Sequence, residues 1–511
     1  MAADRRVVIV GAGSTGLVCA IHLARAGLEV TVLEHSPRPG GASSSVEATL
    51  PGFVHDHCAG YNPMTIASPA MRELELEAEG VSWISPEAIM AHPFEDGTAI
   101  ALHRDLGATV DSLNAAQPGA GAQWGALIEQ YRPLATRLVE AILSPLPPVR
   151  PPLALAAVLR RDGLLLARRM TGSAEAFGLD VFDGATRPTA WFSGSAQHSG
   201  LAPSTAGSGA FGFLLQLLGH SHGWPFPAGG QGRLADALLA LATRAGVRVR
   251  CAAHVDRVLV RGGRAAGVLL RGGEELAARD VVTTISARPL ADMLPDDALP
   301  DRLMRRLRIW RYSTAAFKLD YALRRPVPWT AGEARLASVV HVGGELRDLA
   351  AAADAGQRGD MPDRPALVVG QHTLHDRSRA PEGQHTLYCY GHVPARYECS
   401  DEEVADRIEA QLERFAPGFS ELVLARAIRG PERSEAENPS LVDGDLGGGT
   451  YELDQQLIFR PAPELCRHRT PLRGLYVTGA SVHPGGSVQG MGGRSAARAL
   501  LADRRLRPWR A

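Results

Sequence analysis

The sequence predicts an α/β fold in which helices flank a parallel sheet and a second, mixed α+β unit adjoins it. Two features of the two chain ends support this fold class. The apolar run Val7–Val10 leads directly into a glycine-rich turn and an apolar helix, and a second glycine-rich segment follows the apolar run 474–477. The 511 residues are 45% hydrophobic, which is enough to build more than one large core.

Each element of the parallel sheet has its own signal. All four residues of Val7–Val10 are apolar, as in a strand that is buried on both faces. Gly11–Gly16 forms a turn, Leu17–Ala24 has the apolar spacing of a helix, and Glu29–Leu33 is the next strand, so the whole is one βαβ unit. Further strands are predicted at 247–249, 254–260, 266–270 and 280–284, with a hairpin turn at Gly262-Gly263 and a final helix at about 492–501.

Composition predicts the organisation of the remaining chain. Residues 71–219 are rich in Ala and Leu and are predicted to be mostly helical, whereas 301–444 mix strand-like and helical patterns. We therefore expect one domain built from 1–70, 220–300 and 445–511, and a substrate-binding domain built from 71–219 and 301–444.

The glycine turn has the residues that a bound dinucleotide requires. Gly11 permits the tight turn, Gly13 lets the backbone approach a pyrophosphate, and Gly16 lets helix and strand pack closely. Ser14 and Thr15 open the helix, and its N-terminal N–H groups and positive dipole end attract phosphates. The turn and its flanking strands therefore predict a Rossmann-type dinucleotide site.

The segment after the second strand indicates that the dinucleotide is FAD. Glu34 ends this strand, where a carboxylate binds ribose hydroxyls and repels the 2′-phosphate of NADP. Residues 35–45 are small and rich in Gly and Ser, which lets the chain run alongside a long, extended cofactor. NAD-dependent dehydrogenases do not usually need such a segment. We expect FAD contacts from His35, Gly40, Gly41 and Ala42.

Charge and composition exclude several function classes. With 54 basic and 55 acidic residues the net charge is −1, which gives no basis for nucleic-acid binding. The six cysteines form no Cys-x-x-Cys pair, so we expect reduced thiols in a cytoplasmic protein and no metal site. We find no secretory leader and no apolar run near the roughly 20 residues that cross a bilayer. Leu153–Met170 mixes leucines with arginines and is interpreted as a peripheral membrane contact or as a lid helix.

These motifs resemble the phytoene desaturase-like (phytoene dehydrogenase-related) group of FAD-dependent oxidoreductases, within the flavin amine oxidase and glutathione-reductase-type superfamily. The likeness begins at Val7–Gly41, continues at Gly52–Asp56 and 223–230, and is clearest at 474–486. It also includes 438–451 and covers nearly the whole chain. The resemblance implies a glutathione-reductase-type FAD-binding Rossmann domain joined to the mixed α+β substrate domain.

The same resemblance implies further cofactor contacts. Gly479 and Ala480 would face the pyrophosphate, and the backbone of Val255 would hold the adenine. Backbone N–H groups that open the last helix would face flavin N1 and the C2 carbonyl, where a helix N-terminus stabilises the negative charge of the reduced ring. These groups belong to Gln489, Gly490 and Met491.

Three side chains are candidates for catalysis. Lys318, the one lysine of the chain, lies in the strand-like alternation Ala315–Leu323, shortly before Trp329. In the amine oxidase branch a comparable lysine binds a water that faces flavin N5, so the resemblance implies that Lys318 steers oxygen or polarises the reduced flavin. The alternative is a surface lysine on a half-exposed strand. His198 could remove a proton, and Tyr451, like Trp224, could form a cavity wall, with ordinary packing as the alternative for all of them.

We expect an FAD-dependent dehydrogenase or desaturase that takes hydride from a C–H bond and needs few protein acid–base groups. The resemblance implies an apolar or polyene-type substrate, such as a terpenoid, carotenoid or polyketide-like molecule of secondary metabolism. Two alternatives stay open: a flavin amine oxidase that uses oxygen, and an escort-type protein of the same fold without redox chemistry. The sequence leaves open the oligomeric state and the electron acceptor, whether oxygen, a quinone or NAD(P).

Overall fold

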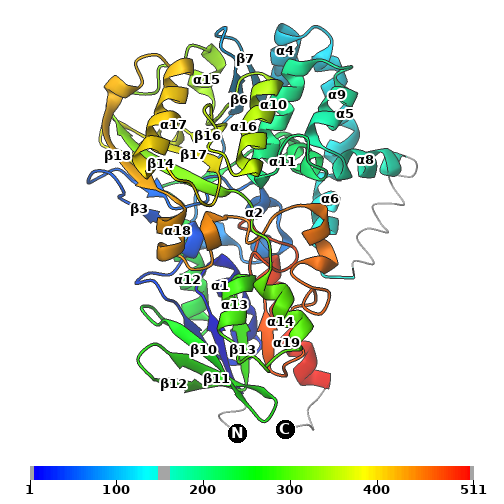
Figure 1. Ribbon diagram of the computed structural model, residues 1–511, viewed down its shortest axis with the longest axis vertical. Helices are drawn as coiled ribbons and strands as arrows, with labels where there is room; N and C mark the ends of the chain where they lie inside the picture. Colours follow the sequence, from blue (N-terminus) through cyan, green and yellow to red (C-terminus); the bar gives the residue numbers. More distant parts are fainter. Residues whose placement is uncertain (1–4, 148–161, 507–511) are drawn as a thin grey trace.

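A parallel sheet lies in the lower half of the molecule in Figure 1, which shows the computed structural model; the structure describes residues 5–147 and 162–506. This sheet has five strands in the order β19–β13–β1–β2–β9, and every neighbouring pair is parallel. Its strands come from both ends and from the middle of the chain. They are β1 (Arg6–Val10), β2 (Glu29–Leu33), β9 (Arg248–Arg250), β13 (Asp280–Thr283) and β19 (Leu475–Val477).

Different layers cover the two faces of the parallel sheet. Ile9 and Val32 point into a core shared with three helices, α1 (Ser14–Arg25), α12 (Gly232–Arg244) and α19 (Met491–Leu506). Val8 and Val281 point the other way, into a core shared with an antiparallel sheet. These three layers confirm the α/β class and the Rossmann-type arrangement. The antiparallel sheet consists of β10 (Val255–Arg261), β11 (Arg264–Leu270) and β12 (Glu275–Ala277).

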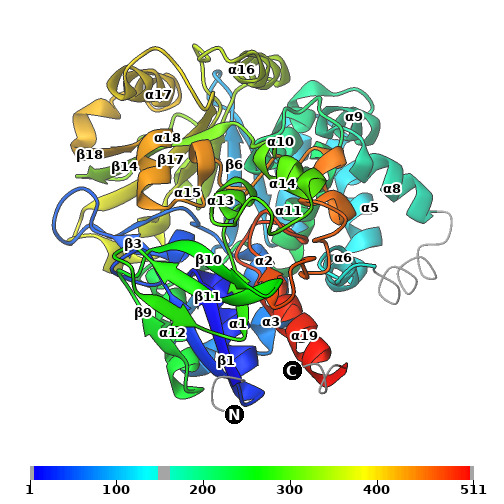
Figure 2. The same ribbon diagram turned by 60° about the horizontal axis from the view of Figure 1, so that its bottom comes forward.

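The upper half of the molecule contains a separate mixed sheet in the order β18–β14–β17–β16–β15–β6–β7 (Figures 1 and 2). One face packs against α15 (Gly332–Leu336) and α17 (Asp401–Phe415), and the other packs against a group of helices. The strands are β6 (Ala88–Pro93), β7 (Ala99–His103), β14 (Ala315–Leu323), β15 (Val339–Val342), β16 (Leu367–Gly370), β17 (His385–Val393) and β18 (Val423–Arg429). The helices are α4 (Leu106–Ala116), α5 (Ala120–Tyr131), α9 (Ala174–Val181), α10 (Thr186–Ala196) and α11 (Ser208–His222).

The remaining helices and strands lie around these sheets. Their bounds are β3 (Ser45–Val46), β4 (His55–Asp56), α2 (Pro63–Ala67), α3 (Pro69–Arg72), β5 (Trp83–Ile84), α6 (Ala135–Ile142), α8 (Asp162–Thr171), β8 (Phe226–Pro227), α13 (Ala287–Asp292), α14 (Asp301–Arg308), α16 (Leu346–Arg358) and α18 (Pro431–Glu437). The domain boundaries expected from the sequence stay a prediction.

Local signals predicted several elements well. β14 spans the alternating segment Ala315–Leu323, and Gly262 and Gly263 have φ values of 58° and 69°, as a tight hairpin turn requires. The prediction that 71–219 is mostly helical is wrong at β6 and β7. β6 pairs antiparallel with its neighbour β7 and parallel with β15, about 250 residues further along the chain, and this second pairing leaves no local signal.

The described ranges contain no helix with the length and apolarity needed to cross a bilayer. Of the stretch interpreted as a membrane contact or a lid, residues 153–161 lie outside the described residues. The remainder belongs to α8, on which Leu164 and Leu165 are exposed.

Candidate active site

Of the three glycines in the turn between β1 and α1, one has a backbone that is open to the cavity. A Cβ built on Gly11 would lie 2.2 Å from Thr284 Oγ1, and one on Gly16 would lie 2.1 Å from the Gly11 carbonyl oxygen. A Cβ on Gly13 would meet no described atom within 4 Å. Gly11 and Gly16 are therefore glycines because packing leaves no room, whereas Gly13 keeps a backbone surface open to the cavity.

The N-terminus of α1 is ready to bind an anion. Gly13 is its N-cap residue, and no described side chain caps this end or places an acid in the first turn. Ser14 and Thr15, the first two helical residues, line the cavity. An uncapped helix start combines free N–H groups with the positive end of the helix dipole, which is what a pyrophosphate needs.

Glu34 is held rigidly at the expected adenosine end. Its carboxylate is buried and accepts the backbone N–H of Ala12 at 2.7 Å and that of Ser36 at 2.9 Å. His35 and Val255 line the cavity beside it. Because main-chain donors fix its orientation, Glu34 presents acceptor oxygens to the cavity wall in one defined position.

One large cavity connects the expected adenosine end to the mixed-sheet half of the molecule. Its volume is about 1490 Å³, above the roughly 300–1,000 Å³ of a pocket for one drug-sized ligand. The cavity therefore has room for a dinucleotide and a second molecule. Sequence-predicted cofactor residues that line it are Gly11, Gly13, Ser14, Thr15, Gly16, Glu34, His35, Gly40, Gly41, Ala42, Val255, Gly479 and Ala480.

The glycine-rich loop before α19 meets the cavity slightly earlier in the chain than the resemblance implies. Gly485–Val488 line the cavity, whereas Gln489, Gly490 and Met491 lie behind them. The side chain of Gln489 accepts the backbone N–H of Met491 at 2.6 Å and donates to the Gly485 carbonyl at 3.2 Å. Gln489 therefore caps α19 and braces the loop that forms the wall.

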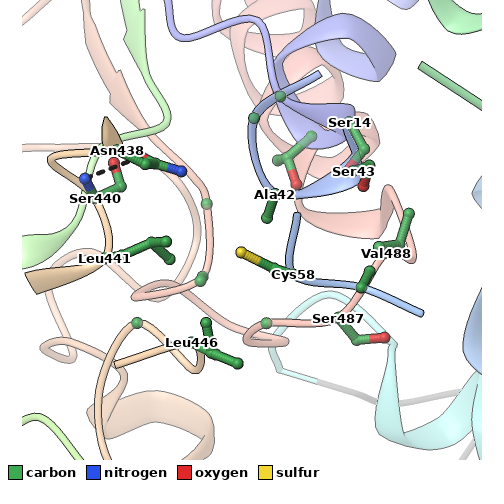
Figure 3. A pocket seen from close by; sticks show the side chains of 18 of the residues that line it. Ser14, Ala42, Ser43, Cys58, Asn438, Ser440, Leu441, Leu446, Ser487 and Val488 are labelled. Atoms are coloured by element: carbon green, nitrogen blue, oxygen red, sulfur yellow. Dashed lines mark hydrogen bonds between the residues drawn. The ribbon is translucent and has the colours of Figure 1, made fainter. Parts of the chain in front are cut away.

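Segments far apart in the sequence face each other across this cavity (Figure 3). Ser14 and Ala42 lie on one side, and Leu441 and Leu446 lie on the other, with the side chain of Cys58 pointing into the space between them. Burial raises the pKa of the Cys58 thiol to about 11, so the thiol is protonated at neutral pH. Sequence reasoning did not single out Cys58, because nothing around it resembles a reactive cysteine motif.

Lys318 is buried, so the alternative of a surface lysine is wrong. Only 5% of it is exposed, its ammonium forms an ion pair with Asp320, and it lies 4.6 Å from the ring centre of Tyr388. Burial lowers the pKa of Lys318, although the Asp320 carboxylate opposes this effect. Lys318 does not line the cavity; Tyr388 and Cys58 form the wall beside it. Its predicted role toward the flavin stays a prediction.

His198 and Tyr451 both line the cavity, about 250 residues apart in the chain. His198 contacts Tyr390 and His341 through its two ring nitrogens, at 3.2 and 3.0 Å, and burial lowers its pKa to about 4. The Tyr451 hydroxyl accepts the backbone N–H of Gly486 at 3.1 Å. The catalytic roles of both residues stay predictions.

Aromatic side chains gather in the cavity wall although only 5% of the chain is aromatic. Sequence reasoning did not locate them apart from Trp224 and Tyr451. The sequence of β17 did contain a pattern that could have found them, because strand alternation places Tyr388, Tyr390 and His392 on one face. The aromatic residues of the wall are Tyr61, Phe211, Trp224, Tyr388, Tyr390 and Tyr451.

The arrangement of the cavity wall fits FAD. Open backbone at Gly13, the uncapped start of α1 and the fixed Glu34 carboxylate follow one another along one wall, as an extended dinucleotide requires. Within residues 5–147 and 162–506, no three His, Cys, Asp or Glu side chains are grouped as metal ligands.

Comparisons with known proteins agree with this geometry. The family model described as "Flavin containing amine oxidoreductase" matches residues 14–501. A hydroxyneurosporene desaturase of Cereibacter sphaeroides is 30% identical, over 98% of this chain and 98% of its own length. A pyridine nucleotide-disulfide oxidoreductase domain-containing protein 2 of Rattus norvegicus is 28% identical, over 97% of this chain and 93% of its own. An oxidoreductase structure from Methanosarcina mazei shares the fold, with a TM-score of 0.65 at 17% identity over 97% of this chain and 100% of its own.

The resemblance to the phytoene desaturase-like group is thereby confirmed, and so is FAD as the cofactor. The escort-type alternative, which lacked redox chemistry, is wrong. The chain belongs to the flavin containing amine oxidoreductase family and is an FAD-dependent oxidoreductase.

Proposed function

We propose that this enzyme is a dehydrogenase of the desaturase type, which takes hydride from a C–H bond of an apolar, polyene-like substrate such as a terpenoid, a carotenoid or a polyketide-like molecule. The observation that carries the proposal is the neutral, largely apolar wall at the mixed-sheet end of the cavity. Residues of this wall are Ile142, Met170, Leu214, Leu215, Trp224, Ala316 and Val368. The name of the Cereibacter sphaeroides relative supports the same reaction class.

Titratable groups in this wall favour a neutral substrate. Burial lowers the pKa of both His198 and His392 to about 4, so neither ring is charged at neutral pH. The Cys58 thiol is protonated there too, since burial raises its pKa to about 11. A cation placed beside these three groups loses hydration without gaining an ion pair from them. This favours an apolar molecule over the protonated amine of the amine oxidase alternative.

The protein's own part in the reaction is to bind, orient and exclude water. Bound FAD supplies the hydride acceptor. Residues 11–16, Glu34 and Gly479 would hold the dinucleotide, while Trp224 and its aliphatic neighbours would position the reacting C–H bond. This division needs few protein acid–base groups, which fits the neutral wall.

An anaerobic flavin-reduction experiment tests the proposal. We expect the visible flavin absorbance of the purified enzyme to bleach when polyenes are added without oxygen. Amines and simple alcohols, added at the same concentration, serve as the comparison. Bleaching by amines alone would contradict the desaturase reaction and support the amine oxidase alternative.

Lys318→Met is expected to retain FAD but to change the rate of flavin reduction or reoxidation by about tenfold or more. The lysine charge lies directly behind the wall residues Tyr388 and Cys58, so its loss changes the electrostatic potential in the cavity. Stopped-flow measurement of both half-reactions checks this, with Lys318→Arg as the variant that keeps the charge. Wild-type rates in both half-reactions of Lys318→Met would exclude a role for Lys318.

A further inference from the structure

Three side chains form a hydrogen-bonded row that ends in the cavity wall. Tyr390 Oη lies 3.2 Å from His198 Nδ1, and His198 Nε2 lies 3.0 Å from His341 Nε2. Tyr390 and His198 line the cavity, whereas His341 is completely buried behind them on β15. The direction in which each hydrogen bond runs decides what Tyr390 offers to a ligand.

Both imidazole rings of the row are neutral. Burial lowers the pKa of His198 to about 4 and lowers the pKa of His341 well below its usual value. Each ring therefore has one N–H group and one nitrogen lone pair. Since the two Nε2 atoms are hydrogen-bonded to each other, one of them donates and the other accepts.

Only two arrangements satisfy this condition, and they differ at His341 Nδ1. If His198 donates to His341, then His341 Nδ1 must be the protonated nitrogen; if His341 donates, its Nδ1 is a bare lone pair. Within residues 5–147 and 162–506, His341 Nδ1 is buried and has no hydrogen-bond partner. Buried N–H groups without an acceptor are rarer in proteins than acceptors without a donor. The second arrangement is therefore the stable one.

This arrangement leaves the hydroxyl hydrogen of Tyr390 free. His341 Nε2–H donates to His198 Nε2, and His198 Nδ1–H donates to the oxygen of Tyr390. In the described part of the chain the Tyr390 hydroxyl has no other partner, so its hydrogen can only point toward the cavity. His198 and His341 are then positioning residues, because both nitrogens of His198 are occupied and neither is available as a base.

Three other aromatic donors of the wall are already used. Tyr61 and Trp224 donate to backbone carbonyls at 2.6 and 2.8 Å, and Tyr388 donates to the carbonyl of Cys58. Tyr451 accepts a backbone N–H from the C-terminal glycine loop, away from the apolar core cluster that contains Tyr390. Among the cavity-lining tyrosines of this cluster, Tyr390 is therefore the one whose hydroxyl hydrogen is free for a ligand.

We propose that Tyr390 donates a hydrogen bond to an oxygen of the substrate, and that the substrate is an apolar molecule with a carbonyl or hydroxyl oxygen at the position that reaches β17. This inference rests on the proposed function and narrows its substrate class. An apolar wall with one unsatisfied donor discriminates strongly in favour of a ligand that supplies the acceptor, because otherwise the donor stays buried without a partner.

Ligand binding to the oxidised, FAD-loaded enzyme tests the inference separately from turnover. The probes are retinol, retinal and their parent hydrocarbon, together with farnesol, farnesal and farnesene as a second, shorter series. Dissociation constants come from the shift of the flavin spectrum. We expect the oxygenated members to bind about 3- to 10-fold more tightly than the hydrocarbons, the net effect of one hydrogen bond.

Tyr390→Phe is expected to remove this preference and to leave hydrocarbon binding within about twofold of wild type. Tyr131→Phe is the matched control, since Tyr131 is buried in α5 and does not line the cavity; it should keep the preference. FAD content and thermal unfolding verify that each variant folds.

Two results would overturn the inference alone: equal binding of hydrocarbons and oxygenated probes by wild type, or an undiminished preference in Tyr390→Phe. A change of the flavin spectrum in ligand-free Tyr390→Phe would also overturn it, because the hydroxyl would then bind the cofactor. If no apolar probe of either series binds, the apolar substrate class fails and the inference fails with it. If amines alone bleach the flavin while the wild-type enzyme still binds the oxygenated probes more tightly than the hydrocarbons, only the proposed function is contradicted.

Discussion

Gly13→Asp is expected to fold as the wild-type chain does and to bind FAD at least about 100-fold more weakly. Gly13 has φ −69° and ψ 172°, a conformation open to any residue, and its Cβ would enter open space. Asp is moreover a favoured N-cap residue, so its carboxylate would accept the free N–H groups that start α1. The same carboxylate would occupy the place of the pyrophosphate and repel it.

Titration of the apoprotein with FAD, followed by flavin absorbance, measures this loss, and thermal unfolding verifies the fold. Gly332→Asp is the matched control: Gly332 starts α15, is exposed, and has open space around its missing Cβ. It should bind FAD normally. A Gly13→Asp protein with wild-type FAD affinity would show that the phosphates bind elsewhere.

Arg379→Leu is expected to lower the free energy of unfolding of the FAD-loaded enzyme by about 3–5 kcal/mol. Arg379 is 1% exposed; it donates to Asp56 at 2.6 Å, to Asp376 at 3.1 Å and to the Pro227 carbonyl at 3.1 Å. Asp56 in turn accepts the N–H of Gln231, which precedes α12. The variant would leave two carboxylates inside the protein without their counter-charge, at a point where both halves of the molecule meet.

The loss of unfolding free energy in Arg379→Leu should be larger at high pH than at low pH. Burial alone raises the pKa of Asp56, but Arg379 reverses this and holds the pKa below its usual value in the wild type. Without Arg379 the pKa of Asp56 rises in the folded protein, so the folded variant releases its proton less readily than the wild type does. Destabilisation therefore grows as pH rises above the ordinary carboxyl pKa.

Chemical denaturation of the FAD-saturated proteins at pH 5 and pH 8 measures both effects. Arg261→Leu is the control, because Arg261 pairs with Glu275 at the surface, where the side chains are 66% and 49% exposed. Loss of this surface ion pair should lower the free energy of unfolding by at most about 1 kcal/mol. An Arg379→Leu protein as stable as this control would show that the buried network does not hold the two halves together.

Cofactor binding was predictable because its requirements are local. Gly11, Gly13 and Gly16 lie within six residues, and the turn between one strand and one helix already implies what each of them does. The role of Glu34 is predictable because the length of one βαβ unit places it at the end of the second strand. In contrast, the contact of the Gln489, Gly490 and Met491 backbone with the flavin stays a prediction; the wall nearby is formed by Gly485–Val488, which the Gln489 side chain braces.

The substrate end was not predictable in the same way. The alternation of β17 places Tyr388 and Tyr390 on one face, but no local signal shows that this face meets His198, which follows α10, and His341 of β15. Lys318 could be assigned to a strand, yet its burial beside Asp320 depends on β14 lying between β17 and β18.

The sequence by itself determined the α/β class, the FAD-binding turn and the acidic residue that ends the second strand, because tight turns and close backbone approach are decided within a few consecutive residues. Only the tertiary structure decided which groups are buried, neutral or left with a free hydrogen. Those properties depend on desolvation and on hydrogen bonds between segments hundreds of residues apart, and they exist only once the two sheets have packed around the cavity.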